Sequence, residues 1–295
     1  MHPSPPDPGW LAPLTGAQIS DADFARLGAF IESVCGIQVA AGKKIMLEGR
    51  LRRRLRQLGL DNFSDYTNRV LAGGDEAEVR LMIDEISTNK TDFFRESHHF
   101  DYLTTQALPA LLRESGGQRL VRIWSAACSS GEEPFTLAMV LSEAALVSPG
   151  LSFQILASDI STEMLSRARA ATYDAVTVEP VPLALRQKYL LRRRDGTPQV
   201  RVVPTLRDRV RFRRLNLMDS DYALGPPLEA IFCRNVFIYF SRRLQSEILD
   251  RFVSNLVPGG YLFLGHSESI NGFDVALTQV APTVYCKVDV KRRRK

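Results

Sequence analysis

From about Leu120 onward, short apolar strands alternate with amphipathic helices, and this alternation constrains the fold more than any other feature of the chain. Strands are expected at 121–126, 153–158, 228–232, 261–265 and 283–288. Helices are expected between them at 134–143, 164–171 and 242–256. Strands that alternate with helices in short units form a parallel, doubly wound sheet. We therefore predict an α/β domain over residues 89–290.

The first part of the chain has a different pattern. Apolar residues at helical spacing follow Ser20, an expected helix N-cap, and stop at Gly36. A second helix is predicted from four leucines that lie within about 80° of one another on a helical wheel, with Arg50, Arg53 and Arg56 on the opposite side. Further helices are expected at 63–71 and 76–86. Residues 19–88 thus predict an all-α domain. A flexible Pro-rich leader is expected before it at 1–18, and a basic tail is expected after the α/β domain at 291–295.

Residues 189–215 interrupt the rhythm of strands and helices. β-prone residues alternate at 200 and 202 and again at 210 and 212, near the turn residues Asp195-Gly196. This pattern is typical of a β-hairpin. We predict a small β-subdomain inserted into the α/β domain at about 189–215.

Basic residues are concentrated in two windows. Gly42–Leu60 holds seven basic residues and one acidic, and Arg186–Arg214 holds eleven and two. The net charge of the chain is only +5, so the remainder is acidic overall. Such patches attract polyanions or acidic protein surfaces. A nucleic-acid binder is one reading, but the windows lack the interleaved aromatic residues on which bases stack, and we expect no nucleic acid as partner.

Several classes of protein are excluded or disfavoured. No stretch approaches the roughly 18 consecutive apolar residues of a spanning helix, so no membrane insertion is expected. The four cysteines are far apart and form no CxxC pair, which predicts free thiols in a reducing compartment. The N-terminus lacks the cationic start and apolar run of an export signal, so we expect a cytoplasmic protein. His98 and His99 are adjacent and should face different ways, and no metal site is expected.

A loop of small residues connects the first strand to its helix, from Ser125 to Gly131. Small side chains allow the backbone to approach a nucleotide-like ligand at this turn. The GxGxxG fingerprint is missing, and Glu132 and Glu133 at the helix start would repel a pyrophosphate. They suit a ligand that carries a positive charge, which favours the sulfonium of S-adenosylmethionine over NAD or ATP. The residues alone also permit a tight turn whose glutamates only complement the helix dipole.

Asp159 follows the second strand directly. An acid at this place can accept hydrogen bonds from the ribose hydroxyls of an adenosine ligand. An aspartate here can equally serve only as the N-cap of the next helix.

Six segments occur in a recognisable order along the chain. They are Asn89–Phe100, Trp124–Pro134, Ala157–Ile160, Asn216-Leu217, Phe232–Phe240 and Pro258–Ser269, which ends Gly-His-Ser-Glu-Ser. Together they resemble the CheR family, the glutamate methyltransferases of chemotaxis receptors. The resemblance extends from about Phe24 to Lys287.

The resemblance implies a Rossmann-like, S-adenosylmethionine-dependent O-methyltransferase that has an antiparallel last strand and uses no metal. It implies esterification of glutamate side chains on cytoplasmic receptor helices to 5-O-methyl esters, with S-adenosylhomocysteine as product, and we expect a monomer. Cofactor contacts then fall on Asn89, Thr91, Arg95, Glu132, Asp159, Asn216, Leu217, Arg234 and Asn235. Arg95 and Tyr239 fall nearest the reacting methyl group. The receptor-docking positions are Lys43, Arg50, Arg53 and Arg56.

Some members of this family use the inserted β-subdomain to hold a peptide at the receptor C-terminus, and they have a longer, glycine-containing turn there. The matching turn here, Arg192–Gln199, is a few residues shorter, so we expect activity that does not depend on such a tether. Two alternatives remain open. The same chemistry could act on another bacterial signalling protein or a small carboxylic acid, or the protein could be a cofactor-binding signalling module without turnover.

Overall fold

The computed structural model describes residues 18–193 and 195–288, so the expected leader, apart from residue 18, and the expected basic tail lie outside the described residues. The chain divides into two compact units. The first runs to Val34 and resumes over Gln38–Ile86; the second comprises Cys35–Ile37 and everything from Ser87 onward. No helix within the described ranges combines the length and the apolar character that a membrane crossing requires.

The first unit is all-α, as the family resemblance and the helical spacing predicted. Its helices are α1 (Asp21–Cys35), the short 3-10 turn η1 (Ala41–Lys43), α2 (Lys44–Leu58), α3 (Phe63–Leu71) and α4 (Glu76–Ile86). The Ser20 hydroxyl accepts the backbone N–H of Asp23 at 3.0 Å, so Ser20 caps α1 as expected. Leu47, Leu51 and Leu55 are fully buried, which confirms the core face of α2.

One arginine of the first basic window is not a surface residue. Arg54 is buried and pairs with Glu78, with 2.6 Å between its Nη2 and the carboxylate Oε2. The Tyr66 hydroxyl donates to the same carboxylate at 2.9 Å. Arg54 of α2 is therefore part of an internal ion pair, whereas Lys43 at the end of η1 and Arg53 and Arg56 of α2 are exposed.

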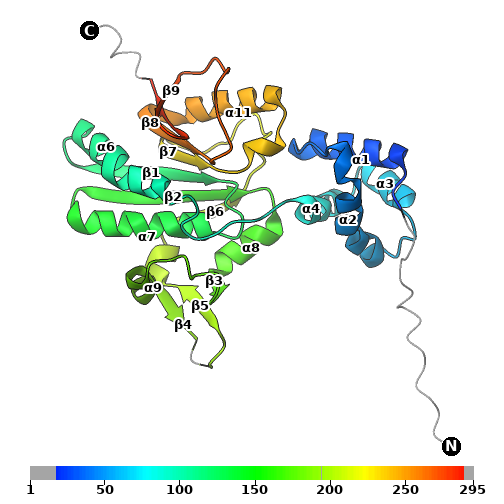
Figure 1. Ribbon diagram of the computed structural model, residues 1–295, viewed down its shortest axis with the longest axis horizontal. Helices are drawn as coiled ribbons and strands as arrows, with labels where there is room; N and C mark the ends of the chain where they lie inside the picture. The colour runs from blue at the N-terminus through cyan, green and yellow to red at the C-terminus, as the bar shows by residue number, and fades with distance from the viewer. Residues whose placement is uncertain (1–17, 194, 289–295) are drawn as a thin grey trace, which may run out of the picture. The chain divides into compact units, whose positions relative to one another are not determined.

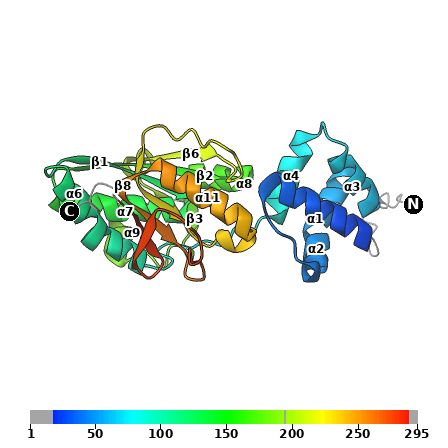
Figure 2. The ribbon, with the colours of Figure 1, turned by 90° about the horizontal axis from the view of Figure 1, so that it is seen from above.

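The second unit is built on a seven-stranded sheet with the order β6-β2-β1-β7-β8-β10-β9. The strands are β1 (Arg119–Ala126), β2 (Leu151–Asp159), β6 (Val210–Arg214), β7 (Leu228–Cys233), β8 (Leu256–Leu264), β9 (Leu277–Ala281) and β10 (Val284–Lys287). The adjacent strands β6, β2, β1, β7 and β8 are mutually parallel, whereas β10 is antiparallel to both β8 and β9. The predicted doubly wound sheet with an antiparallel end is confirmed. Figures 1 and 2 show the sheet from two directions.

Helices cover both faces of this sheet (Figure 1). They are α5 (His98–Tyr102), the π-helical turn η2 (Leu103–Ala107), α6 (Leu108–Glu114), α7 (Glu132–Val147), α8 (Thr162–Ala170) and α11 (Arg242–Asn255), with the 3-10 turn η3 (Phe237–Tyr239) before α11. One apolar core contains residues of α5 to α8, and a second core on the other face is formed by α11 with Trp124 of β1. Cys35, Cys128 and Cys233 are buried and Cys286 is half-buried, and these four cysteines form no disulfide within residues 18–193 and 195–288.

The inserted subdomain differs in extent from the prediction. A three-stranded antiparallel sheet has the order β3-β5-β4, with β3 (Thr172–Asp174), β4 (Leu190–Arg192) and β5 (Gln199–Val202). Helices α9 (Leu183–Tyr189) and α10 (Pro204–Arg207) flank it. The hairpin of β4 and β5 is confirmed, but the placement of Val210 and Phe212 in it was wrong, because β6 pairs in parallel with β2. Alternation predicts a strand but does not identify the strand that pairs with it.

Candidate active site

A cavity lies at the carboxyl ends of the parallel strands. Its empty volume is about 970 Å³, part of it open to solvent, which is enough for a nucleoside-sized ligand. Residues that directly follow β1, β2, β6 and β7 line it, and so does the segment 87–92. In the sheet, β2 lies on one side of β1 and β7 lies on the other, so the strand order reverses direction at β1. Ligands of doubly wound sheets bind at such a reversal.

The structure brings nine of the ten predicted cofactor and catalytic residues to this one cavity. They are Asn89, Thr91, Arg95, Asp159, Asn216, Leu217, Arg234, Asn235 and Tyr239. Glu132 is the exception, because its carboxylate accepts the Ser130 hydroxyl at 2.8 and 3.0 Å and Glu133 lines the cavity in its place. Successive helical residues point about 100° apart, so the phase of α7 decides which glutamate faces the ligand.

The loop after β1 owes its shape to left-handed backbone. Ala127 and Ser129 have φ of 59° and 50°, and Gly131 has φ of 99°. A Cβ at Gly131 would lie 2.9 Å from the Tyr173 hydroxyl oxygen and 3.0 Å from the Cβ of Ala168, so only glycine fits. The small residues of this loop were predicted to let the backbone approach a ligand. They also allow Tyr173 of β3 and Ala168 of α8 to pack against the turn.

Two backbone N–H groups donate hydrogen bonds to the Asp159 carboxylate. Its Oδ2 accepts the Ser129 N–H at 2.8 Å, and its Oδ1 accepts the Ser161 N–H at 2.9 Å. The helix N-cap is Ser161, whose hydroxyl accepts from Met164, so the reading of Asp159 as a cap was wrong. Asp159 lines the cavity as expected, and its contact with ligand hydroxyls stays a prediction.

The segment that carries Arg95 is strained and anchored. Phe94 and Glu96, its two neighbours, have φ of 55° and 53°. The Phe94 N–H donates to the Thr136 hydroxyl at 3.2 Å, and the Arg95 Nη1 donates to the Lys90 carbonyl at 2.9 Å. Left-handed backbone at two large residues costs of order 1–3 kcal/mol each, and such strain clusters at functional sites.

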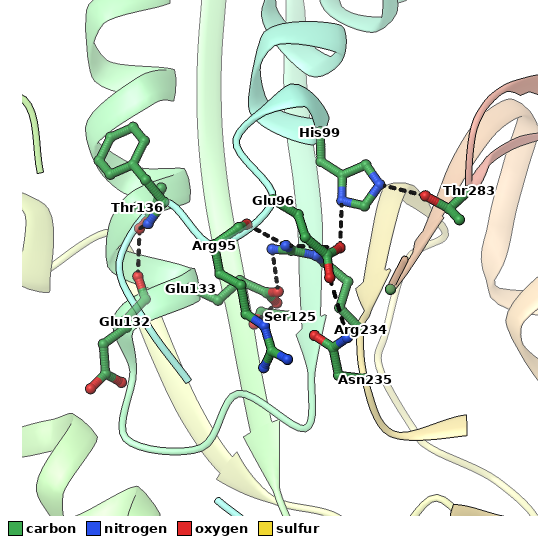
Figure 3. A network of polar contacts seen from close by, with 12 residues as sticks. Arg95, Glu96, His99, Ser125, Glu132, Glu133, Thr136, Arg234, Asn235 and Thr283 are labelled. Atoms are coloured by element: carbon green, nitrogen blue, oxygen red, sulfur yellow. Dashed lines mark hydrogen bonds and ion pairs between the residues drawn. The ribbon is translucent and has the colours of Figure 1, made fainter. Parts of the chain in front are cut away.

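A buried ion cluster lies beside the cavity (Figure 3). The Arg234 guanidinium lies 3.2 Å from a carboxylate oxygen of Glu96 and 3.2 Å from one of Glu133, and it also donates to the Arg95 carbonyl. The Ser125 hydroxyl donates to Glu133 at 2.6 Å. Burial raises the pKa of Glu133, although Arg234 opposes this. With both carboxylates ionised, the cluster carries one net negative charge, which suits a cationic ligand.

Glu268 organises the turn that carries Tyr239, a role that sequence reasoning did not predict. Its carboxylate accepts the backbone N–H groups of Gly265, Asn235 and Phe237 at 2.6, 2.8 and 2.7 Å. Asn235 is left-handed, with φ of 60°, so the turn needs this external support. The only sequence signal was the Gly-His-Ser-Glu-Ser segment, which carried the family resemblance without indicating a role.

His98 and His99 do not face away from each other as expected. Their ring centroids are 4.2 Å apart, and the His266 ring lies 5.0 Å from that of His98. His99 is fully buried and shares a 2.8 Å hydrogen bond with the Thr283 hydroxyl. Burial, the Arg234 guanidinium and the His98 ring lower the pKa of His99 to about 3.

We expect His99 to make the stability of the second unit pH-dependent. The unfolded histidine takes up a proton near pH 6.5, whereas the folded one stays neutral down to about pH 3. Between these values the unfolded chain binds more protons, so stability falls as pH falls, by up to ~1.4 kcal/mol per pH unit. Urea denaturation of wild type and His99→Gln between about pH 7 and about pH 5 measures this, and the variant should have the shallower slope. Equal slopes would contradict a neutral buried His99.

Several arginines of the second basic window donate hydrogen bonds to backbone carbonyls at the protein surface. Arg214 donates to the Ile160 carbonyl at 3.2 Å, and Arg201 donates to the Ala170 carbonyl at 3.1 Å. Arg213 donates to the Ala223 carbonyl at 2.9 Å. Arg201 and Arg214 are exposed and keep their charge, so these contacts leave the window basic, and Arg214 contacts the cavity wall at Ile160.

A doubly wound sheet with an antiparallel end, a small-residue turn after β1, an acid at the end of β2 and a cavity over both define an S-adenosylmethionine-dependent methyltransferase. The chain belongs to the CheR methyltransferase family. Residues 89–286 match the family model described as "CheR methyltransferase, SAM binding domain", and residues 22–87 match "CheR methyltransferase, all-alpha domain". The family, the fold and the cofactor expected from the sequence are confirmed.

Curated relatives match over nearly the whole chain. "Chemotaxis protein methyltransferase" of Escherichia coli (strain K12) is 41% identical over 271 residues, which cover 90% of this chain and 91% of the relative. "Chemotaxis protein methyltransferase 1" of Pseudomonas aeruginosa is 39% identical over 261 residues, 85% of this chain and 92% of the relative. The relative from Borreliella burgdorferi, "Chemotaxis protein methyltransferase", is 38% identical over 273 residues, 91% of this chain and 95% of the relative.

Proposed function

We propose that this protein methylates glutamate side-chain carboxylates on cytoplasmic helices of chemoreceptors, giving glutamate 5-O-methyl esters. The observation that carries the proposal is the single cavity that gathers nine of the ten residues expected at the cofactor and the reacting methyl group. The names of the curated relatives support a substrate in chemotaxis.

The residues at the cavity fit a cationic nucleoside donor. Asp159 would accept the ribose hydroxyls of the donor, and the carboxylates of Glu96 and Glu133 beside Arg234 would make the cavity favourable for a cationic group. The other contacts assigned to the donor are Asn89, Thr91, Asn216, Leu217 and Asn235. Glu132 does not line the cavity, so its expected contact stays a prediction, and we propose Glu133, which lines the cavity, as an acidic contact of the donor.

The chemistry needs placement more than proton transfer. S-adenosylmethionine supplies a methyl group on a cationic sulfur when it is bound. A glutamate carboxylate is already ionised at neutral pH, so the site requires no general base. Transfer turns an anion and a cation into two neutral groups, so a dry site favours it and a strong grip on the attacking oxygen opposes it. Arg95 and Tyr239 therefore orient the reactants.

Arg95→Ala and Tyr239→Phe are each expected to lower kcat at least ~10-fold at saturating donor, because misplaced reacting atoms lose the benefit of proximity. Both side chains line the cavity, and the Arg95 guanidinium is fixed by the Lys90 carbonyl. The measurement is methyl transfer to a receptor cytoplasmic fragment at saturating donor and acceptor. Near-normal turnover in both variants would show that neither Arg95 nor Tyr239 orients the reactants.

We propose that exposed basic residues of η1 and α2 dock the acidic acceptor helices. Lys43, Arg53 and Arg56 are exposed, and Arg53 keeps a 3.5 Å contact with Glu85 that is too exposed to hold it strongly. Arg50 is half-buried and donates to the Ile86 carbonyl, so its part in docking is indirect.

We propose that the receptor C-terminal peptide is not needed. The turn between β4 and β5 is short, and Arg193 is engaged at 2.7 Å with Asp195 of the same turn. Calorimetry with an isolated receptor tail peptide is expected to show no measurable binding. Tight binding would overturn tether independence and leave the proposed methylation untouched.

The proposed function is tested by transfer of a radiolabelled methyl group to a panel of acceptors. The panel contains receptor cytoplasmic fragments, other signalling proteins and small carboxylic acids. Label on receptor fragments that is lost when their glutamates are replaced by alanine supports the proposal, and the Arg53→Ala–Arg56→Ala variant should raise KM for the fragment without changing donor affinity. Label only on other acceptors, or on none, would contradict it.

A further inference from the structure

The cofactor cavity is lined by a segment far from the cofactor-binding domain in sequence. The match to the SAM binding domain begins at residue 89, and the all-alpha match covers 22–87. Yet Cys35–Ile37, which comprises the last residue of α1 and the two residues after it, belongs to the second compact unit. Cys35 and Ile37 line the same cavity as Asn216 and Tyr239.

The segment is locked in place by a glycine. Gly36 has φ of 75°, a conformation that side chains rarely adopt. A Cβ at this position would lie 2.4 Å from Leu244 Cδ2, 3.2 Å from Phe240 Cδ1 and 3.3 Å from Met218 Sδ. The backbone of Gly36 thus packs against side chains at the start of α11 and in the turns before it, and a larger residue would be strained at this φ and would have to displace the Leu244 side chain.

The two neighbours of Gly36 present an apolar wall. Cys35 is 3% exposed, and burial raises the pKa of its thiol to about 11, so it is neutral at physiological pH. The Ile37 N–H donates to the Cys35 sulfur, which ties the two residues together. Ile37 is half-buried, so apolar surface facing the cavity is left for a ligand to cover.

We propose that Cys35–Ile37 is a part of the donor site contributed by the N-terminal portion of the chain, with Ile37 as the contacting residue and Gly36 as the residue that positions it. The proposal rests on the proposed function, since it takes S-adenosylmethionine and its product as the ligands. It means that the family's all-alpha region supplies more than the docking face, because one of its connections completes the cofactor cavity.

The test is calorimetric binding of S-adenosylhomocysteine to the full chain. Ile37→Ala is expected to weaken binding about 10-fold, which is the loss of one apolar contact of ~1.4 kcal/mol. Gly36→Ala should weaken it at least as much, and Ile37→Leu should restore most of the affinity. Matched controls are Gly28→Ala, where a Cβ meets only Val39 at 4.0 Å, and Ile45→Ala, where the side chain is 82% exposed. Both controls should bind like wild type.

A second measurement distinguishes a direct contact of Ile37 with the ligand from a purely structural role of this segment. Hydrogen exchange of a peptide spanning residues 35–40 should slow when S-adenosylhomocysteine is added to the wild type. Wild-type affinity in Ile37→Ala, or unchanged exchange in this peptide, would overturn the inference and leave the proposed function standing. Absence of binding by the wild type would overturn both.

Discussion

Arg234→Met is expected to lower the free energy of unfolding of the second unit by about 3–5 kcal/mol and to abolish measurable binding of S-adenosylhomocysteine. The Arg234 side chain is 3% exposed and lies between the Glu96 and Glu133 carboxylates (Figure 3). Removing it leaves two buried carboxylates without their cation. It also removes the donor to the Arg95 carbonyl, so the segment that carries Arg95 loses an anchor.

Urea denaturation and calorimetry measure the two effects. The matched control is Arg243→Met, because Arg243 pairs with Glu247 at 3.1 Å but its side chain is 90% exposed, so the change should be within ~0.5 kcal/mol. Adding Glu133→Gln to Arg234→Met should restore part of the stability, since one uncompensated charge is then removed. A loss below ~1 kcal/mol in Arg234→Met would show that the cluster is not the support we describe.

Asp159→Asn is expected to weaken binding of S-adenosylhomocysteine about 100-fold. Each hydrogen bond to a charged group contributes ~1.5–3 kcal/mol, and a tenfold change in affinity is ~1.4 kcal/mol. Both oxygens of Asp159 already accept backbone N–H groups, from Ser129 and Ser161. An asparagine must turn its amide N–H₂ toward one of these donors, so it loses the turn geometry as well as the charge.

Asp221→Asn is the control for this prediction. Asp221 also accepts a backbone N–H, that of Ala223 at 2.8 Å, but it is exposed and does not line the cavity. The affinity of the Asp221→Asn variant for S-adenosylhomocysteine should equal that of wild type. Thermal melting should show that the Asp159→Asn and Asp221→Asn variants are both folded. Affinity within about threefold of wild type in Asp159→Asn would exclude a ribose contact of the expected strength.

The strongly periodic parts of the fold were predictable from the sequence. The helices over 63–71 and 76–86 begin and end where their spacing indicated, because an amphipathic face specifies both the element and the side it buries. Strand β6 shows the limit of this reasoning. The alternation of Val210 and Phe212 predicted a strand, but its parallel partner β2 lies more than 50 residues earlier, and no local pattern records that pairing.

The site was predictable where a residue's place in an element determines its role. Asp159 was expected at the cavity because it ends a parallel strand. The choice between Glu132 and Glu133 depended on the rotational phase of α7, which two adjacent acids do not reveal. The contribution of Ile37 was missed because it requires a tertiary contact of Gly36 with α11, more than 200 residues away.

The central claim is that a carboxylate accepts the methyl group, and ester lability tests it most directly. A receptor cytoplasmic fragment is labelled with the enzyme and radioactive S-adenosylmethionine, then treated with mild alkali, and volatile radioactivity is collected. Because a glutamate methyl ester hydrolyses under these conditions, we predict that nearly all the label is released as methanol. Label that stays on the fragment through alkali would mean a nitrogen or ether acceptor and would contradict the account.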